Sequence, residues 1–134
     1  MPLLFQIFLP VTGQIASGKN VLLFEQRLQE FIGNPRILST GEMSATISLA
    51  LYMAGVRPGD EVISSPLACV ATNAPVRNLF ANIRWCDCDP ATGALDPEAL
   101  RRTVTPATKA IIAFHWAGNP LEPCTMSRIQ PGFP

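Results

Sequence analysis

Short apolar runs alternate with helix-patterned segments along this chain, and this alternation most constrains its fold. Apolar runs of strand length fall at residues 36–39, 61–64, 83–86 and 109–114. Helical spacing of apolar residues predicts helices over residues 20–31, 43–54, 71–80 and 97–102. Repeated strand and helix segments of these lengths are typical of βαβ units, whose strands pair in parallel and are buried on both faces. The sequence therefore predicts an α/β fold, mainly a parallel sheet flanked by helices.

Turn and cap residues support these boundaries. Gly33-Asn34-Pro35 ends the first predicted helix, and Arg57-Pro58-Gly59-Asp60 has the composition of a tight turn. Asp96 is placed to cap a helix whose first residue is Pro97, which suits the fixed φ of proline. Turn-forming and helix-capping residues therefore separate the predicted helices and strands.

Composition excludes several classes of protein. The 134 residues make room for one domain, and ten basic residues balance ten acidic ones to give a net charge of zero. A neutral chain without charge runs offers no electrostatic surface for nucleic acid or an anionic membrane. No stretch reaches the ~18 apolar residues of a membrane span. With 48% hydrophobic and 15% charged residues, the chain is predicted to pack, not to be disordered.

The termini and the cysteines predict a cytoplasmic setting. Met1 to Leu9 is apolar, but no Lys or Arg precedes it and Pro10 closes it, so a signal peptide is not expected. Without a secretory context the cysteines are expected to be reduced. They are Cys69, Cys86, Cys88 and Cys124. Residues 121–134 contain three prolines and no periodicity, so we expect an irregular tail.

The segment from Ser39 to Thr46 is a candidate anion site. It runs from a predicted strand to a helix through small hydroxyl residues. Ligands of open parallel sheets bind at the carboxyl ends of strands, where helix N-termini present unpaired N–H groups. One reading is a phosphate-binding site, and the other is that Ser39 or Thr40 simply caps the helix. The two glycine-rich nucleotide-binding motifs, G-x-G-x-x-G and G-x-x-x-x-G-K-[ST], do not occur in the chain.

Two further sequence features are candidate chemical sites. Cys86-Asp87-Cys88-Asp89 lacks a second ligand pair at zinc-like spacing, so a strand end with alternating side chains is favoured over a metal site. His115, the single histidine, follows a predicted buried strand and should lie at the carboxyl edge of the sheet. A ligand-side role and a structural role both remain open for it.

Seven short motifs follow one another at a characteristic spacing. They are Ser17-Gly18 with Phe24-Glu25, Met43-Ser44-Ala45-Thr46, Arg57-Pro58-Gly59-Asp60, Ala71-Thr72-Asn73-Ala74, Asp87 and Asp89 leading to Leu95-Asp96, Thr105-Pro106-Ala107-Thr108-Lys109, and His115-Trp116-Ala117-Gly118-Asn119-Pro120. In this order they resemble the DegT/DnrJ/EryC1/StrS aminotransferases, pyridoxal-phosphate enzymes of fold type I that act mostly on nucleotide-linked keto-sugars. Residues 1–120 resemble the N-terminal part of the large domain of that family.

The resemblance implies a pyridoxal phosphate cofactor and a set of binding residues. Met43, Ser44 and Ala45 match the phosphate-binding helix start, although the family usually has glycine where Met43 stands. Cys69 matches a position that often carries an aromatic ring stacked on the pyridine, and His115 begins the family's His-x-x-Gly segment beside the cofactor. The implied partners are glutamate, a nucleotide-linked keto-sugar and a second subunit in a homodimer.

The catalytic groups of the family have no match here. Family chains are longer, and past this region they supply a Schiff-base lysine and an aspartate that pairs with the pyridine nitrogen. Lys19 and Lys109, the two lysines of the chain, match neither position. The resemblance thus implies a truncated aminotransferase with no catalytic residue of its own. Two alternatives are a non-catalytic module for phosphate binding or subunit pairing, and a small doubly wound nucleotide-binding domain.

Overall fold

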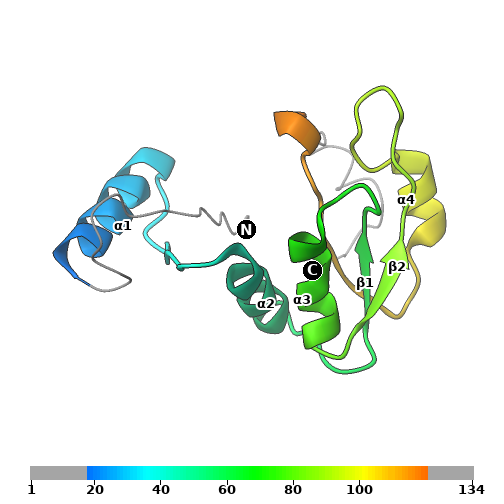
Figure 1. The fold of residues 1–134 in the computed structure, drawn as a ribbon, viewed down its shortest axis with the longest axis horizontal. Coiled ribbons are helices and arrows are strands. Elements are labelled where there is room, and N and C mark those ends of the chain that lie inside the picture. Colours follow the sequence, from blue (N-terminus) through cyan, green and yellow to red (C-terminus); the bar gives the residue numbers. More distant parts are fainter. Residues whose placement is uncertain (1–17, 121–134) are drawn as a thin grey trace.

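A computed structural model describes residues 18–120 of the chain (Figure 1). Its elements are helix α1 (Lys19–Ile32), helix α2 (Met43–Met53), strand β1 (Glu61–Ser64), helix α3 (Val70–Asn78), strand β2 (Asn82–Trp85), helix α4 (Pro97–Thr103), strand β3 (Thr108–Ile111) and the short 3-10 helix η1 (Trp116–Gly118). The four predicted helices are confirmed, as are three of the four predicted strands, with ends that shift by at most three residues.

The three strands form a parallel sheet in the order β2-β1-β3. Side chains of the central strand alternate between the two faces. Val62 packs with residues of α2 and α3, whereas its neighbour Ile63 packs with residues of α4. Figure 1 shows α3 and α4 on opposite sides of the sheet. The predicted α/β fold, with a parallel sheet between helices, is therefore confirmed.

Each face of the sheet has its own core. Leu51, Val56, Val62, Val76 and Ala81 are buried on the α2 and α3 side. Ile63, Cys86, Leu95, Ala99 and Leu100 are buried on the α4 side. The start of α4 is fixed as the sequence predicts, because Asp96 accepts a hydrogen bond from the Glu98 N–H at 2.9 Å and Pro97 occupies the first turn.

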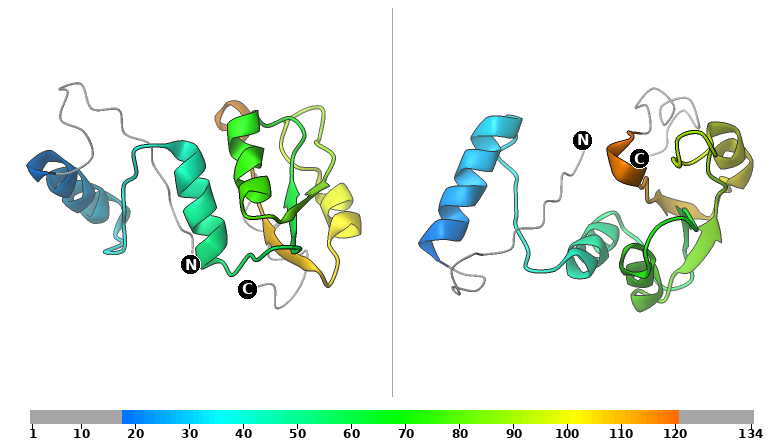
Figure 2. Two further views of the ribbon diagram at one scale, coloured as in Figure 1. Left: turned by 60° about the horizontal axis from the view of Figure 1, so that its bottom comes forward. Right: turned by 45° about the horizontal axis from the view of Figure 1, so that its top comes forward.

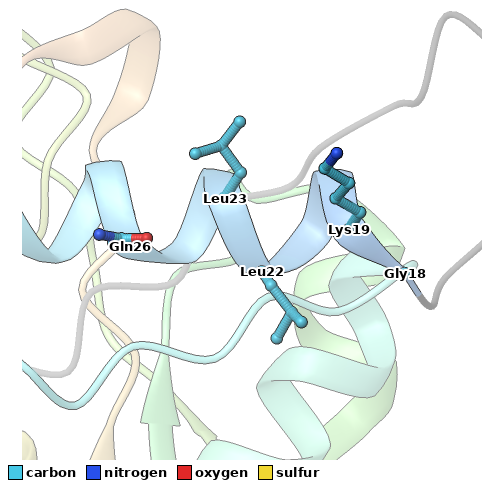
Figure 3. A pocket seen from close by; sticks show the side chains of 5 residues that line it. All are labelled: Gly18, Lys19, Leu22, Leu23 and Gln26. Carbon is cyan, nitrogen blue, oxygen red and sulfur yellow. The ribbon is translucent and has the colours of Figure 1, made fainter.

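Helix α1 lies apart from the sheet (Figure 1) and contributes no buried residue to either core. Several of its apolar side chains face solvent: Leu22 is 68% exposed and Phe31 is 89% exposed. Figure 3 shows Leu22 and Leu23 projecting in different directions from this helix, and both line a shallow pocket with Gly18, Lys19 and Gln26. The Glu25 carboxylate accepts hydrogen bonds from the Ser39 N–H at 2.8 Å and the Ser39 hydroxyl at 2.7 Å, which ties α1 to the connection before α2.

Two strand predictions need correction. Residues 36–39 form no strand, because the Ser39 N–H is bonded to the Glu25 side chain instead of a neighbouring strand. The strand predicted over 109–114 ends at Ile111. The last cross-strand bond runs from the Ile112 N–H to the Ile63 carbonyl at 2.8 Å, and β1 itself ends at Ser64, so residues beyond Ile112 have no partner strand there.

Several predictions fall outside the described residues: the absence of a signal peptide at Met1 to Leu9, the irregular tail at 121–134, and the state of Cys124. Cys69, Cys86 and Cys88 are free thiols. Within residues 18–120, no helix combines the length and apolar character needed to cross a membrane.

Candidate functional site

The candidate site lies at the carboxyl edge of the sheet, where β1, β2 and β3 end. Three segments meet at this edge: the start of α2, the connection from β1 into α3, and the segment that follows β3. The Ser44 hydroxyl donates to the Ala71 carbonyl at 3.3 Å, which joins the first turns of α2 and α3. In the left view of Figure 2 the starts of α2 and α3 and the helix η1 lie at the same end of the molecule.

The start of α2 presents free backbone donors. Its N-cap residue is Glu42, which has extended backbone angles and makes no side-chain cap bond. The first intrahelical bond runs from the Thr46 N–H to the Glu42 carbonyl at 3.1 Å. The N–H groups of Met43, Ser44 and Ala45 therefore have no acceptor within the helix. Together with the positive end of the helix dipole they suit an anion.

The alternative reading of this segment, a cap supplied by Ser39 or Thr40, is wrong. The Ser39 hydroxyl donates to Glu25, and the Thr40 hydroxyl donates to the Glu42 carbonyl at 3.1 Å and contacts the Thr46 hydroxyl. The expected strand before the helix is also absent, as described above. The anion-binding geometry thus depends on the helix start alone, and not on a junction between strand and helix.

Cys69 stands at the start of α3, where it is the N-cap residue and is exposed. Its sulfur lies 3.5 Å from the Thr72 hydroxyl. Hydrogen bonds from the Thr72 hydroxyl, and secondarily from the Thr72 backbone, lower the pKa of the Cys69 thiol because they stabilise the thiolate. The side chain therefore offers a polarisable sulfur to this edge instead of a flat ring.

A buried polar network, which the sequence did not predict, joins the end of β1 to α3 near Cys69. The Ser64 hydroxyl donates to the Asn73 side-chain oxygen at 2.5 Å, and the Asn73 amide donates to the Ser65 carbonyl at 3.2 Å. The Ser65 hydroxyl contacts the Cys88 sulfur at 2.9 Å and accepts from the Leu67 N–H at 3.0 Å. Two consecutive serines, the last residue of a buried strand and the next one, are the local sequence signal of this network. It fixes the connection that carries Cys69.

His115 is exposed and directly precedes η1, at the carboxyl end of β3 as predicted. The segment is held against the loop after β2, because the Asn119 side-chain amide donates to the Thr92 carbonyl at 3.3 Å. Met43, Ser44, Cys69 and His115 therefore lie on segments that end at one edge of the sheet. Met43 and Ser44 are half-buried, and Ala45 is exposed.

The Cys86 to Asp89 segment behaves as a strand end. Cys86 is buried in the core beside α4, and burial raises the pKa of its thiol to about 11. Asp87 is exposed, and Cys88 contacts Ser65. Among residues 18–120, no group of three or more His, Cys, Asp or Glu side chains is arranged to hold a metal ion.

The two lysines lie away from this edge. The Lys109 side chain packs beside Gly55, with its Cε 3.5 Å from where a β-carbon on Gly55 would stand. Gly55 follows the carboxyl end of α2, so Lys109 lies at the opposite end of that helix from Ser44. An 11-residue helix is about 16 Å long. Lys19 belongs to α1. Within residues 18–120, this edge therefore carries backbone N–H donors and a thiol, but no lysine side chain.

Comparison with known proteins identifies the relatives of this chain. The sequence model of the DegT/DnrJ/EryC1/StrS aminotransferase family matches residues 9–131. The chain is 34% identical over 118 residues to the spore coat polysaccharide biosynthesis protein SpsC of Bacillus subtilis. It is 39% identical over 107 residues to the UDP-2-acetamido-2-deoxy-3-oxo-D-glucuronate aminotransferase of Pseudomonas aeruginosa. These matches cover 88% and 80% of the chain but only 30% of each relative.

Solved structures show the same relationship. The sugar aminotransferase CalS13 of Micromonospora echinospora superposes with a TM-score of 0.77 at 36% identity, over 92% of this chain and 35% of that protein. The pyridoxal phosphate form of the sugar aminotransferase Spr1654 of Streptococcus pneumoniae superposes with a TM-score of 0.80 at 25% identity, over 89% and 30%. The chain spans about three tenths of the length of these relatives. It belongs to the DegT/DnrJ/EryC1/StrS aminotransferase family.

Proposed function

We propose that this chain forms the phosphate-binding part of a pyridoxal-phosphate-dependent sugar aminotransferase. The observation that carries the proposal is the start of α2, where three backbone N–H groups without helical acceptors point out at the carboxyl edge of the sheet. The relatives described above include a structure in its pyridoxal phosphate form. The family match and the donor set support the same ligand.

The residues present fit the phosphate of this cofactor. The N–H groups of Met43, Ser44 and Ala45 would hold its oxygens, and the Ser44 hydroxyl would add a donor once it exchanges its bond to the Ala71 carbonyl. The Met43 side chain leaves less room for the phosphate to approach these N–H groups, because it is half-buried at a position where a glycine would leave more space. Cys69, the exposed N-cap residue of α3, would present a soft sulfur to the ring of the cofactor.

When bound, pyridoxal phosphate supplies the electron sink for moving an amino group between an amino acid and a keto-sugar. We infer a nucleotide-linked keto-sugar as the acceptor, in keeping with the activity named for the Pseudomonas relative. Glutamate as the amino donor is proposed from the family resemblance alone. Neither lysine of the chain reaches the site to act as the amine nucleophile. This chain by itself therefore binds and orients, and does not complete amino transfer.

We further propose that the protein self-associates, in line with the homodimer that the family resemblance implies. Leu22 and Phe31 of α1 and Trp85 of the edge strand β2 are largely exposed, and such side chains are commonly covered by another subunit. Sedimentation at increasing concentration tests this, and a monomer across the whole range would contradict it.

Titration with pyridoxal phosphate tests the function of the site. We expect a dissociation constant on the order of millimolar, because the phosphate is bound without a covalent link to the chain. Ser44→Ala removes one donor and should weaken binding by about 1 to 2 kcal/mol, roughly 5- to 30-fold. Lys109→Ala is the matched control, since it lies at the far end of α2, and should leave the affinity unchanged.

The opposite pattern would contradict the proposal. Equal affinities in the wild type and Ser44→Ala, with loss of binding in Lys109→Ala, would place the cofactor elsewhere. Reduction by borohydride sharpens the result, because a stable adduct on Lys19 or Lys109 would show that one of these lysines forms the covalent link.

A further inference from the structure

The turn at residues 89–93 packs against the segment that carries His115. Gly93 has a positive φ of 70°, and a β-carbon added there would lie 2.8 Å from Trp116 Cδ1, 2.9 Å from Cγ and 3.1 Å from Cβ. These are atoms at the base of the indole, which cannot swing aside without moving the backbone of η1. The contact therefore requires glycine at position 93 for two independent reasons, backbone angle and space.

The turn itself is well fixed. The Gly93 N–H donates to the Asp89 carbonyl at 2.7 Å, and the Asp89 carboxylate accepts from the Ala91 N–H at 2.8 Å. The Asp89 N–H donates to the Ala94 carbonyl at 2.9 Å, which closes the base of the loop beside the core residue Leu95. The surface that contacts Trp116 is therefore held by backbone hydrogen bonds beside the core, and is not a free loop tip.

The segment after β3 depends on this surface for its position. Cross-strand bonding ends at Ile112, as described above. Beyond it, Trp116 packs on Gly93, Asn119 bonds to the Thr92 carbonyl at 3.3 Å, and Phe114 meets Trp116 edge-on with ring centres 6.0 Å apart. His115 is exposed and stands between these two aromatic residues in the sequence.

We propose that the 89–93 turn is a positioning element for His115. The contact between Gly93 and Trp116 sets where the His115 imidazole lies at the carboxyl edge of the sheet. The position of this imidazole in turn affects the affinity for pyridoxal phosphate. The second part rests on the proposed function, while the first part concerns the placement of the segment alone. Gly93 and Trp116 are positioning residues in this scheme, and neither touches the ligand.

The chain provides a matched control for testing Gly93. Gly33 has φ of 71°, almost the same as Gly93, but a β-carbon there would meet nothing within 4 Å. Gly93→Ala and Gly33→Ala therefore carry the same backbone penalty and differ in the contact with Trp116. Trp116→Ala removes the same contact from the other side without changing any glycine, and its side chain is 43% exposed, so the fold should tolerate the change.

The readout is the single histidine of the chain, which gives one imidazole Hε1 resonance in proton NMR spectra. We expect Gly93→Ala and Trp116→Ala to shift the His115 resonance and to change its rate of modification by diethyl pyrocarbonate, while Gly33→Ala leaves both as in the wild type. Pyridoxal phosphate should bind both shifted variants about 2- to 10-fold more weakly, the range for one hydrogen bond.

The results separate the inference from the function. An unchanged His115 resonance in both Gly93→Ala and Trp116→Ala would overturn the positioning role. A shifted resonance with unchanged pyridoxal phosphate affinity would overturn the link between that position and binding. A wild type that does not respond to pyridoxal phosphate would overturn the proposed function, and the His115 resonance would still decide whether the turn positions the segment.

Discussion

Helices α1 and α4 are both predicted from the sequence, but they differ in how far their apolar side chains are buried. Helix α1 has 14 residues with an apolar stripe, yet none of its residues is buried. Helix α4 has 7 residues and buries Ala99 and Leu100 in the core beside the sheet. Local pattern decides that a segment is helical, whereas a neighbouring layer decides whether its apolar side is covered. The sheet body, residues 43–112, and the α1 arm, residues 18–42, therefore differ in how far packing stabilises them.

The largest expected difference is between two leucines. Leu100 is fully buried against the sheet, and Leu22 is 68% exposed on α1. Leu100→Ala should lower the free energy of unfolding by about 2 to 5 kcal/mol, because it removes transferred apolar surface and leaves a cavity. Leu22→Ala should change it by less than about 0.5 kcal/mol. Urea denaturation measures both, and equal losses would mean that α1 is packed in solution.

Thiol labelling compares the interior of the body with its edge. Burial raises the pKa of Cys86 to about 11 from an ordinary 9.0, so at pH 8 its thiolate fraction falls about 100-fold below that of a free thiol. The pKa of the exposed Cys69 is lowered by Thr72. Iodoacetamide should modify Cys69 first, and Cys86 should react only as the pH rises toward 11. Peptide mass spectrometry reads each site separately.

Thr72→Val is the control for this experiment. It keeps the shape of the side chain but removes the hydroxyl that lowers the pKa of Cys69. Labelling of Cys69 should slow in this variant at neutral pH and recover at higher pH. If Cys86 were modified as fast as Cys69 in the wild type, the core beside α4 would be open to solvent.

A smaller effect is expected at the bond between the arm and its connection. Glu25→Ala removes the acceptor of both Ser39 bonds and should release the 33–42 connection, at a local cost of about 1 kcal/mol. Glu30→Ala, on the same helix, loses only an exposed contact with Gln26. Hydrogen exchange at the Ser39 amide should speed up in the first variant alone. Faster exchange throughout the sheet would show that the arm supports the body.

Much of the fold could be predicted from the sequence because the signals are local. The four residues of β1 follow a turn signature and end at Ser64, and the predicted bounds of the strand agree with the structure. The start of α2 at Met43 was likewise predicted. The run at 36–39 was misassigned because pairing depends on a distant partner, and here Glu25 takes the N–H that a strand would use.

The site was only partly predictable for the same reason. Motif spacing placed Ser44, Cys69 and His115 at strand and helix ends, which the parallel topology brings to one edge. The buried bonds of Asn73 with Ser64 and Ser65 were not foreseen, since hydroxyl and amide residues occur in many loops. The packing of Trp116 on Gly93 joins residues far apart in sequence, and no periodicity reports it.

The most direct test of the central claim is a map of backbone amides during a phosphate titration. Inorganic phosphate added to the labelled chain should move the amide resonances of Met43, Ser44 and Ala45 with one common binding curve, because their N–H groups lack helical acceptors. Amides of α1 should not move, since that helix lies apart from the sheet edge. Shifts confined to α1, or spread evenly over the basic residues with no saturation at the start of α2, would contradict the assignment of this helix start as the phosphate site.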